Sequence, residues 1–188
     1  MEPVRCGWCK GDTLYETYHD QEWGVPVKDD DDLLFEFLVL ETFQAGLSWI
    51  TILKRRENFR VAFDHFDYKK IAKYPETKIL SLLQDEGIIR NKLKVRATVT
   101  NAIAYMEIQK EFGSFSSYIW EFVNNEPIKN KVVNYKDAPA NTPISDAISK
   151  DLKKRGFKFV GSTIIYAFMQ ATGMVNDHQL DCFRYTEV

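Results

Sequence analysis

The apolar residues of this 188-residue chain recur mainly at helical spacing, and this pattern limits what the chain can fold into. Strict alternation of apolar and polar residues, which half-buried strands require, is scarce. One apolar stripe contains Leu34, Phe37, Leu38, Glu41 and Ala45, which fall on the same side of a helix. The periodicity therefore predicts an all-α fold.

Capping residues and helix breakers set the limits of the predicted helices. Asp31 or Asp32 can cap the first of them, and Gly87 and Gly156 each end a later one. The segment 124–143 is rich in Asn, Lys and Pro and is predicted to be a loop, either a lid or simply exposed. The predicted helices span residues 31–46, 48–63, 76–84, 91–110, 114–123, 145–154 and a segment that begins near 161.

The length and the 45% hydrophobic content suit one domain over residues 1–188, divided into two lobes at most. The chain has no apolar run of about 18 residues, as a membrane span would require. Its start, MEPVRCGWCK, lacks the apolar segment of a signal peptide. We therefore expect a cytoplasmic monomer without a membrane partner.

The net charge of −2 argues against bulk electrostatic attraction to nucleic acid. The charge is nevertheless unevenly distributed along the chain. The sequence KDDDD at 28–32 is acidic, whereas the stretches 54–56, 90–96 and 153–155 are rich in Lys and Arg. A short basic strip of this kind can still follow the phosphates of a nucleic acid.

The sequence RCGWC at 5–9 places two cysteines in a C-x-x-C spacing, and the chain has three cysteines in all. An odd number of cysteines in a cytosolic protein makes a disulfide scaffold improbable. The pair is then a redox pair, half of a zinc site, or two unrelated small apolar residues. The redox explanation expects a βαβ context and ranks last, because the surrounding pattern is helical.

Near the end of the chain, VNDHQLDC places His178 and Cys182 four positions apart, so that one helical turn would direct both side chains to one metal ion. This spacing alone is weak evidence. Cys6 and His19 would complete the four ligands of a closed tetrahedral zinc site, although Cys9 competes for the first position. Zinc is the default metal for two thiolates and two imidazoles.

The segment KKRGFKFVGST at 153–163 predicts a helix, a short turn between two glycines and a second helix. Such a hairpin exposes backbone N–H groups beside a helix N-terminus, where Lys158 adds positive charge, and this suits a phosphate. An ordinary connection between helices is a slightly commoner cause of this spacing. GIIRNKLK at 87–94 is likewise either a second phosphate contact or a solvated basic face.

Glu41 lies on an apolar stripe, where an ionised carboxylate is costly unless it meets a donor or a cation. It either turns outward near the end of its helix, which is the commoner outcome, or faces a pocket. Tyr15, Tyr18 and Trp49 would make that pocket suitable for a flat, electron-poor ring. Aromatic residues at helical spacing are more often part of a core.

Six segments together resemble the 3-methyladenine DNA glycosylase I family, of the helix-hairpin-helix superfamily of DNA repair enzymes, over nearly the whole chain. They are RCGW, YHDQEWGVP, LETFQAGLSWITILKRRENFR, GIIRNKLK, KKRGFKFVG and VNDH. The resemblance implies a helical domain whose N- and C-terminal segments are joined by a structural zinc ion. The implied zinc ligands are Cys6, His19, His178 and Cys182, which leaves Cys9 as a spare thiol.

The resemblance also implies the roles of other residues. Glu41 would be the catalytic carboxylate, in a base pocket with Tyr15, Tyr18 and Trp49, and with Trp8 and Trp23 around it. Gln44 and Leu47 would fill the gap left by an extruded base. The DNA-binding hairpin would comprise Gly156, Lys158, Phe159, Gly161, Ser162 and Thr163.

The function implied is that of a monofunctional glycosylase in base-excision repair. It would hydrolyse the N-glycosidic bond of N3-methyladenine flipped out of alkylated double-stranded DNA, and it would release free 3-methyladenine. Asp177, beside His178, is predicted to be structural. The alternatives are a non-catalytic, zinc-stabilised DNA-binding module and a thiol oxidoreductase centred on Cys6 and Cys9.

Overall fold

The computed structural model describes residues 3–188, and most of its regular structure is helical. The helices differ widely in length, and three short 3-10 turns (η1 to η3) lie between or after them. Their bounds are α1 Thr13–Gln21, α2 Asp31–Gln44, α3 Trp49–Leu53, α4 Arg56–Ala62, η1 Asp64–Phe66, α5 Tyr68–Ile71, α6 Glu76–Leu82, α7 Lys92–Phe112, α8 Phe115–Glu121, η2 Tyr135–Asp137, α9 Pro143–Lys154, α10 Ser162–Ala171 and η3 Phe183–Thr186.

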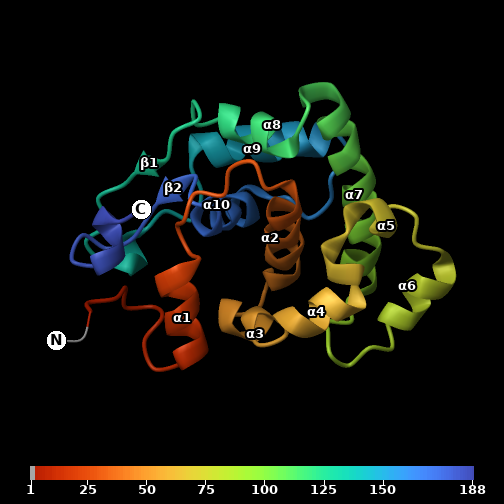
Figure 1. Cartoon of the computed structure of the whole chain (residues 1–188), viewed down its shortest axis with the longest axis horizontal. Helices are drawn as coiled ribbons and strands as arrows, with labels where there is room; N and C mark the ends of the chain where they lie inside the picture. The colour runs from red at the N-terminus through yellow and green to blue at the C-terminus, as the bar shows by residue number, and fades with distance from the viewer. Residues whose placement is uncertain (1–2) are drawn as a thin grey trace.

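Helix α2 forms the centre of the fold, with the other helices arranged around it (Figure 1). Every residue from 34 to 43 in α2 is buried. The side chain of Asp30 caps the helix by accepting the N–H of Leu33 at 2.9 Å, so the prediction of Asp31 or Asp32 as the cap is wrong. Asp31 instead accepts the N–H groups of Phe115 and Ser116, each at 2.8 Å, and thereby ties α2 to the start of α8.

Two short strands depart from the all-α prediction. Strand β1 (Ile128–Lys129) pairs in parallel with β2 (Val175–Asn176), with Ile128 opposite Val175. Both strands are too short for alternation to show in the sequence. The segment 124–143, predicted to be a loop, therefore contains a strand and the turn η2.

The predicted helix 48–63 is divided into α3 and α4, and this part of the prediction is wrong. The break falls at Lys54 and Arg55, directly before Arg56, whose guanidinium turns into the protein interior. There Arg56 donates to Glu36 at 2.5 Å and to Glu22 at 2.7 Å. These two ion pairs connect α4 to α2 and to the end of α1. Both partners lie far from Arg56 in the sequence, so the local hydrophobic pattern could not predict them.

Other helix ends follow local capping chemistry. Helix α1, which the periodicity did not reveal, begins where Asp12 accepts the N–H groups of Leu14 and Tyr15. Helix α9 begins earlier than predicted because Thr142 and Ser145 form a capping box around it. In residues 3–188, no helix is both long and apolar enough to cross a membrane.

The connection between α9 and α10 is a hairpin, as predicted. Gly156 has a φ of 96°, a left-handed conformation that glycine adopts without strain. Phe157 and Val160 are buried and anchor the turn, whereas Lys158 and Phe159 are exposed at its tip.

Candidate active site and metal centre

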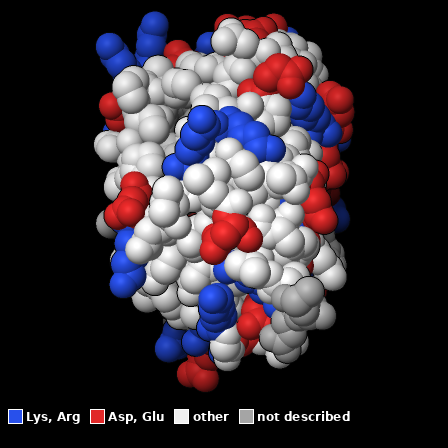
Figure 2. Space-filling view, turned by 90° about the vertical axis from the view of Figure 1, so that its left-hand side faces the viewer, with Lys and Arg blue, Asp and Glu red and all other residues white. Residues whose placement is uncertain are grey.

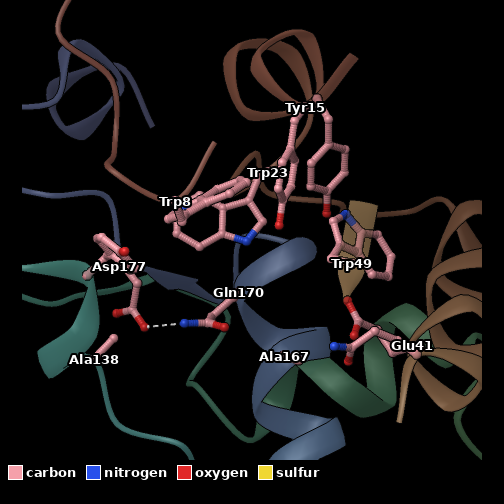
Figure 3. Close-up of a pocket in the computed structure, with 12 residues that line it drawn as sticks. Trp8, Tyr15, Trp23, Glu41, Trp49, Ala138, Ala167, Gln170 and Asp177 are labelled. Carbon is pink, nitrogen blue, oxygen red and sulfur yellow. Dashed lines mark hydrogen bonds between the residues drawn. The ribbon is translucent and has the colours of Figure 1, made fainter. Parts of the chain in front are cut away.

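A cavity of about 210 Å³ lies where α1, α2, α3 and α10 meet the N-terminal segment and the loop before α9 (Figure 3). It brings together all six residues predicted to form the base pocket. They come from four separate parts of the chain, and residues from α10 and the loop before α9 close the other side. The lining consists of Trp8, Tyr15, Tyr18, Trp23, Glu41, Gln44, Trp49, Tyr135, Ala138, Ala167, Gln170 and Asp177.

Aromatic rings supply much of the cavity wall. The ring of Trp8 meets those of Tyr15 and Trp23 edge to face, at centroid distances of 4.8 Å and 4.9 Å. Tyr18 and Trp49 lie 5.5 Å apart on another part of the wall. Their π faces attract positive charge, so the cavity suits a flat ring with cationic character.

Glu41 lies in the last turns of α2, with its side chain directed toward the cavity and 3% of its surface exposed (Figure 3). Within residues 3–188, no donor pairs with its carboxylate, and burial raises its pKa to about 8. A buried carboxyl without a partner is costly to ionise. The site is therefore prepared for a ligand that carries a donor or a positive charge.

Two tyrosines of the cavity, Tyr15 and Tyr18, remain neutral donors at physiological pH. Burial raises the pKa of Tyr15 to about 12 and that of Tyr18 well above its usual range. Glu41 adds to both shifts through its negative charge. The pocket thus offers hydroxyl donors, aromatic faces and one acidic group.

Asp177 lines the cavity from the segment after β2, and hydrogen bonds from three side chains hold it in place. It accepts from Tyr166 at 2.6 Å and from Asn130 at 2.7 Å. It also accepts from Gln170 at 2.9 Å (Figure 3). These bonds connect the segment after β2 to α10 and to the end of β1. Sequence reasoning missed Gln170 as a lining residue, because nothing in its local pattern marks it.

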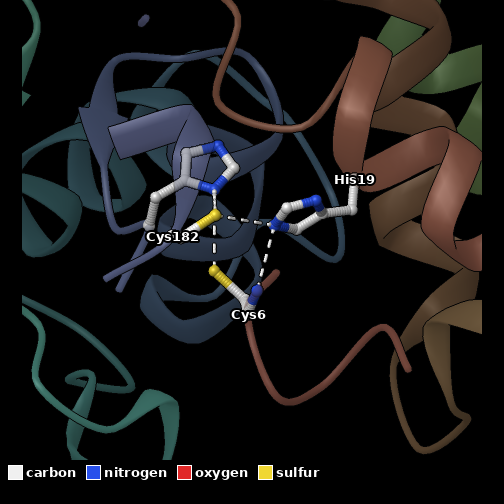
Figure 4. A group of neighbouring side chains, drawn as sticks. Cys6, His19 and Cys182 are labelled. Atoms are coloured by element: carbon white, nitrogen blue, oxygen red, sulfur yellow. Dashed lines mark hydrogen bonds between the residues drawn. The ribbon is translucent and has the colours of Figure 1, made fainter. Parts of the chain in front are cut away.

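The four predicted metal ligands, Cys6, His19, His178 and Cys182, come together at the junction of the two chain ends (Figure 4). Their candidate ligand atoms all lie within 4.8 Å of one another, and all four residues are buried. Nδ1 of His178 lies 3.6 Å from both sulfurs, and Nε2 of His19 lies 3.4 Å from the Cys182 sulfur. Hydrogen bonds from Cys6, His178 and His19 lower the pKa of the Cys182 thiol.

In each of the two histidines, the ring nitrogen that faces away from the cluster contacts an oxygen atom. Nδ1 of His19 lies 2.8 Å from the carboxylate of Asp20, and Nε2 of His178 lies 3.0 Å from the carbonyl oxygen of Trp23. Such contacts fix the tautomer and direct the other nitrogen toward a metal. Two thiols and two imidazoles so arranged fit a tetrahedral zinc ion. Asp20 was missed from sequence, although its position beside His19 is a usable signal.

Cys9 lies outside this cluster. It is buried, its thiol donates to the carbonyl oxygen of Cys6 at 3.2 Å, and burial raises its pKa to about 11. A thiol oxidoreductase requires a reactive thiolate with a lowered pKa. The raised pKa of Cys9 argues against the oxidoreductase alternative.

The residues predicted to contact DNA lie in two turns and are mostly accessible. Leu47, between α2 and α3, is 38% exposed, and Gln44 lines the cavity. In the hairpin, Lys158, Phe159 and the adjacent Thr163 are exposed. The Ser162 hydroxyl, by contrast, lies 2.8 Å from that of Ser145 and is engaged within the protein. Gly161 precedes α10 as its N-cap.

Charged side chains are intermixed on the face of the molecule near the chain ends. Figure 2 shows Lys and Arg separated by Asp, Glu and uncharged surface on the side that lies at the left in Figure 1. This mixture agrees with the small net charge of −2.

The comparisons with known proteins cover almost the whole chain. Residues 8–185 match the model of a family described as methyladenine glycosylase. The chain is 50% identical to DNA-3-methyladenine glycosylase 1 of Escherichia coli, over 96% of each chain. It is also 50% identical to DNA-3-methyladenine glycosylase of Haemophilus influenzae, over 95% of this chain and 96% of the relative.

Solved structures agree with this match. A crystal structure of 3-methyladenine DNA glycosylase I has a TM-score of 0.92 and 49% identity, over 96% of this chain and 98% of that one. A Staphylococcus aureus structure that describes 3-methyladenine recognition by this enzyme has a TM-score of 0.91 and 36% identity, over 95% of each chain.

Proposed function

This chain belongs to the methyladenine glycosylase family, and we propose that it removes 3-methyladenine from alkylated double-stranded DNA in base-excision repair. The observation that carries the proposal is Glu41, a buried carboxyl with no partner among residues 3–188, facing a cavity walled by aromatic rings. N3-methyladenine in DNA is cationic and carries an exocyclic amine, so it supplies both the charge and the donor that this site can receive.

Base recognition would combine stacking with a charged hydrogen bond. Contact with Trp49 and the tyrosines contributes roughly 0.5 to 2 kcal/mol for each favourable cation–π pair, which favours the cationic lesion over neutral adenine. Glu41 would accept a hydrogen bond from the exocyclic amine or an edge nitrogen of the purine. Burial raises the pKa of Glu41 to about 8 in the free protein, and a cationic base beside it would lower that pKa and favour the ionised form.

Hydrolysis would then need little acid catalysis. The bond between the base and the sugar C1′ breaks, its electron pair stays with the base, and neutral 3-methyladenine leaves. Water attacks the resulting sugar cation and loses a proton, which yields an abasic site. The enzyme is monofunctional in this scheme, because no amine forms a Schiff base and the DNA strand is not cut.

DNA would be held by two surface turns of this chain. Gln44 and Leu47 would occupy the gap left by the flipped nucleotide, which costs a few kcal/mol to extrude. The hairpin from Gly156 to Gly161 would bind the phosphates with Lys158 and with the N–H groups at the start of α10. This arrangement supports membership of the helix-hairpin-helix superfamily.

A structural zinc ion would be held by Cys6, His19, His178 and Cys182. When bound, it would cross-link the two ends of the chain and supply no chemistry to the substrate. We further propose that the protein acts as a monomer in the cytoplasm, with DNA as its partner and free 3-methyladenine as its product.

The alternative of a non-catalytic DNA-binding module explains the hairpin and the metal cluster equally well. It gives no reason for a buried, unpaired carboxyl among aromatic rings, because such a group lowers stability unless a ligand uses it. The cavity therefore favours the enzyme.

Single-turnover excision from methylated duplex DNA tests the role of Glu41. We expect Glu41→Gln and Glu41→Ala to lower the rate by about tenfold to a hundredfold, since each removes a charge-assisted hydrogen bond to the base. Glu121→Gln, on the exposed surface of α8, is the matched control and should react at the wild-type rate. Unchanged kinetics in both Glu41 variants would remove this residue from the site.

A further inference from the structure

Helix α7 carries buried polar side chains on a face that otherwise packs against the core. Lys94 is 7% exposed and Asn101 is 2% exposed. The two lie about two helical turns apart and so project from the same side of the helix. Lys94 belongs to the GIIRNKLK segment, for which a phosphate contact or a solvated basic face was predicted. Both predictions are wrong for Lys94, because it points inward.

Asn101 holds the tip of the hairpin through its backbone. Its amide nitrogen donates to the carbonyl oxygen of Lys158 at 3.0 Å, and its amide oxygen accepts the N–H of Lys158 at 2.8 Å. The next residue, Phe159, has a φ of 55°, which is unfavourable for a residue with a side chain. The paired bonds from Asn101 support the tip conformation that exposes Lys158 and Phe159.

Lys94 holds the other turn in a similar way. Its ammonium donates to the carbonyl oxygens of Phe43 at 3.1 Å and Ala45 at 3.0 Å, at the C-terminal end of α2. A cation is favourable there because the helix dipole places partial negative charge on the last carbonyls. Gly46 follows with a φ of 82°, and the chain then turns through Leu47 toward α3.

We propose that Lys94 and Asn101 are positioning residues that fix the turn 44–47 and the hairpin tip 158–159 relative to each other. One rigid helix then presents both segments to the same duplex at a set spacing. The inference rests on the proposed function, in which these two segments contact DNA. Neither residue lines the base cavity.

At the hairpin, this arrangement separates DNA binding from base binding, whereas Gln44 in the turn 44–47 also lines the cavity. When a rigid helix already holds both DNA-contacting segments in place, binding the duplex does not have to order them, so little conformational entropy is lost. Loosening either segment restores that entropy cost and weakens binding. The hairpin contributes nothing to the cavity wall, so loosening its tip leaves the base pocket intact. Loss of Asn101 should therefore weaken DNA binding selectively.

The test compares Asn101→Ala and the milder Asn101→Ser with Thr100→Ala, a control on the exposed side of the same helix. For each protein, the dissociation constant for a duplex with a tetrahydrofuran abasic site and that for free 3-methyladenine are measured. We expect the Asn101 variants to bind the duplex at least about tenfold more weakly, since two hydrogen bonds are lost. Free-base affinity and single-turnover excision at saturating enzyme should stay within about twofold of wild type.

The same measurements on Lys94→Met and Lys94→Arg test the second anchor. Lys94→Met should weaken duplex binding, and Lys94→Arg should restore most of it, because arginine can donate to both carbonyls.

Unchanged duplex affinity in the folded Asn101 variants would overturn the proposal. So would a parallel loss of duplex and free-base affinity, which would indicate a general structural role. If the wild-type protein releases no 3-methyladenine yet the Asn101 variants lose duplex affinity, the proposed function fails and the positioning role stands.

Discussion

Glu41 makes the stability of this protein depend on pH in a way that follows from its burial. Its pKa is raised from 4.5 to about 8, so the folded state binds a proton that the unfolded state releases. The stabilising effect of that proton is complete below pH 4.5 and is lost progressively as the pH rises to about 8.

We therefore expect Glu41→Gln, which carries no charge, to be more stable than wild type at high pH. The difference in free energy of unfolding should be about 2 kcal/mol or more near pH 9 and close to zero near pH 4. Urea denaturation at both pH values measures it, with Glu121→Gln as a control that shows no such difference. A Glu41→Gln variant whose advantage does not grow with pH would contradict the burial of an unpaired carboxyl.

At the residue scale, spacing and resemblance predict which side chains carry the chemistry, but not the groups that hydrogen-bond to them. Cys6, His19, His178 and Cys182 were predicted as a set, and the structure brings them within ligand distance. The carbonyl of Trp23 that orients His178 was not predicted, because a backbone contact leaves no trace in the sequence. Gln170 enters the cavity only through the packing of α10.

At the scale of elements, the presence of a helix was easier to predict from the sequence than a break within a helix. Helix α7 matches its prediction closely because Asn91 caps its start and Gly113, with a φ of 86°, ends it. The division between α3 and α4 depends on ion pairs of Arg56 with residues far away in sequence. The strands β1 and β2 exist only through pairing across the chain.

The junction between β1, β2 and α10 depends on Asp177. Its carboxylate accepts three hydrogen bonds, whereas an asparagine has only one oxygen to accept them. Asp177→Asn should lower the free energy of unfolding by about 1 to 3 kcal/mol and retain most single-turnover activity. Asp181→Asn, exposed beside Cys182, is the matched control. A collapse of the chemical rate with full metal content would instead assign Asp177 to catalysis.

At the scale of the whole molecule, the metal cluster and the cavity share a wall. The ring of Trp23 lies 4.7 Å from that of His178 and 4.9 Å from that of Trp8, so the chain ends and the cavity are packed together. If the cluster holds the proposed zinc ion, its removal should therefore disturb base binding as well as stability.

Cys182→Ser and Cys9→Ser form a matched pair for this expectation. We expect Cys182→Ser to lose bound zinc, melt at a lower temperature and bind 3-methyladenine more weakly. Cys9→Ser should keep its full metal content, because Cys9 lies outside the cluster. Metal analysis and thermal denaturation measure both variants. Full metal content in Cys182→Ser, or loss of zinc in Cys9→Ser, would refute the ligand set.

The most direct test of the proposed activity is the mass of the free bases released when the purified, metal-loaded protein is incubated with methylated duplex DNA. We predict release of 3-methyladenine with intact strands, no release of unmodified adenine, and little release by Glu41→Ala. A folded protein that binds the duplex and releases no base would contradict the glycosylase and leave a DNA-binding module.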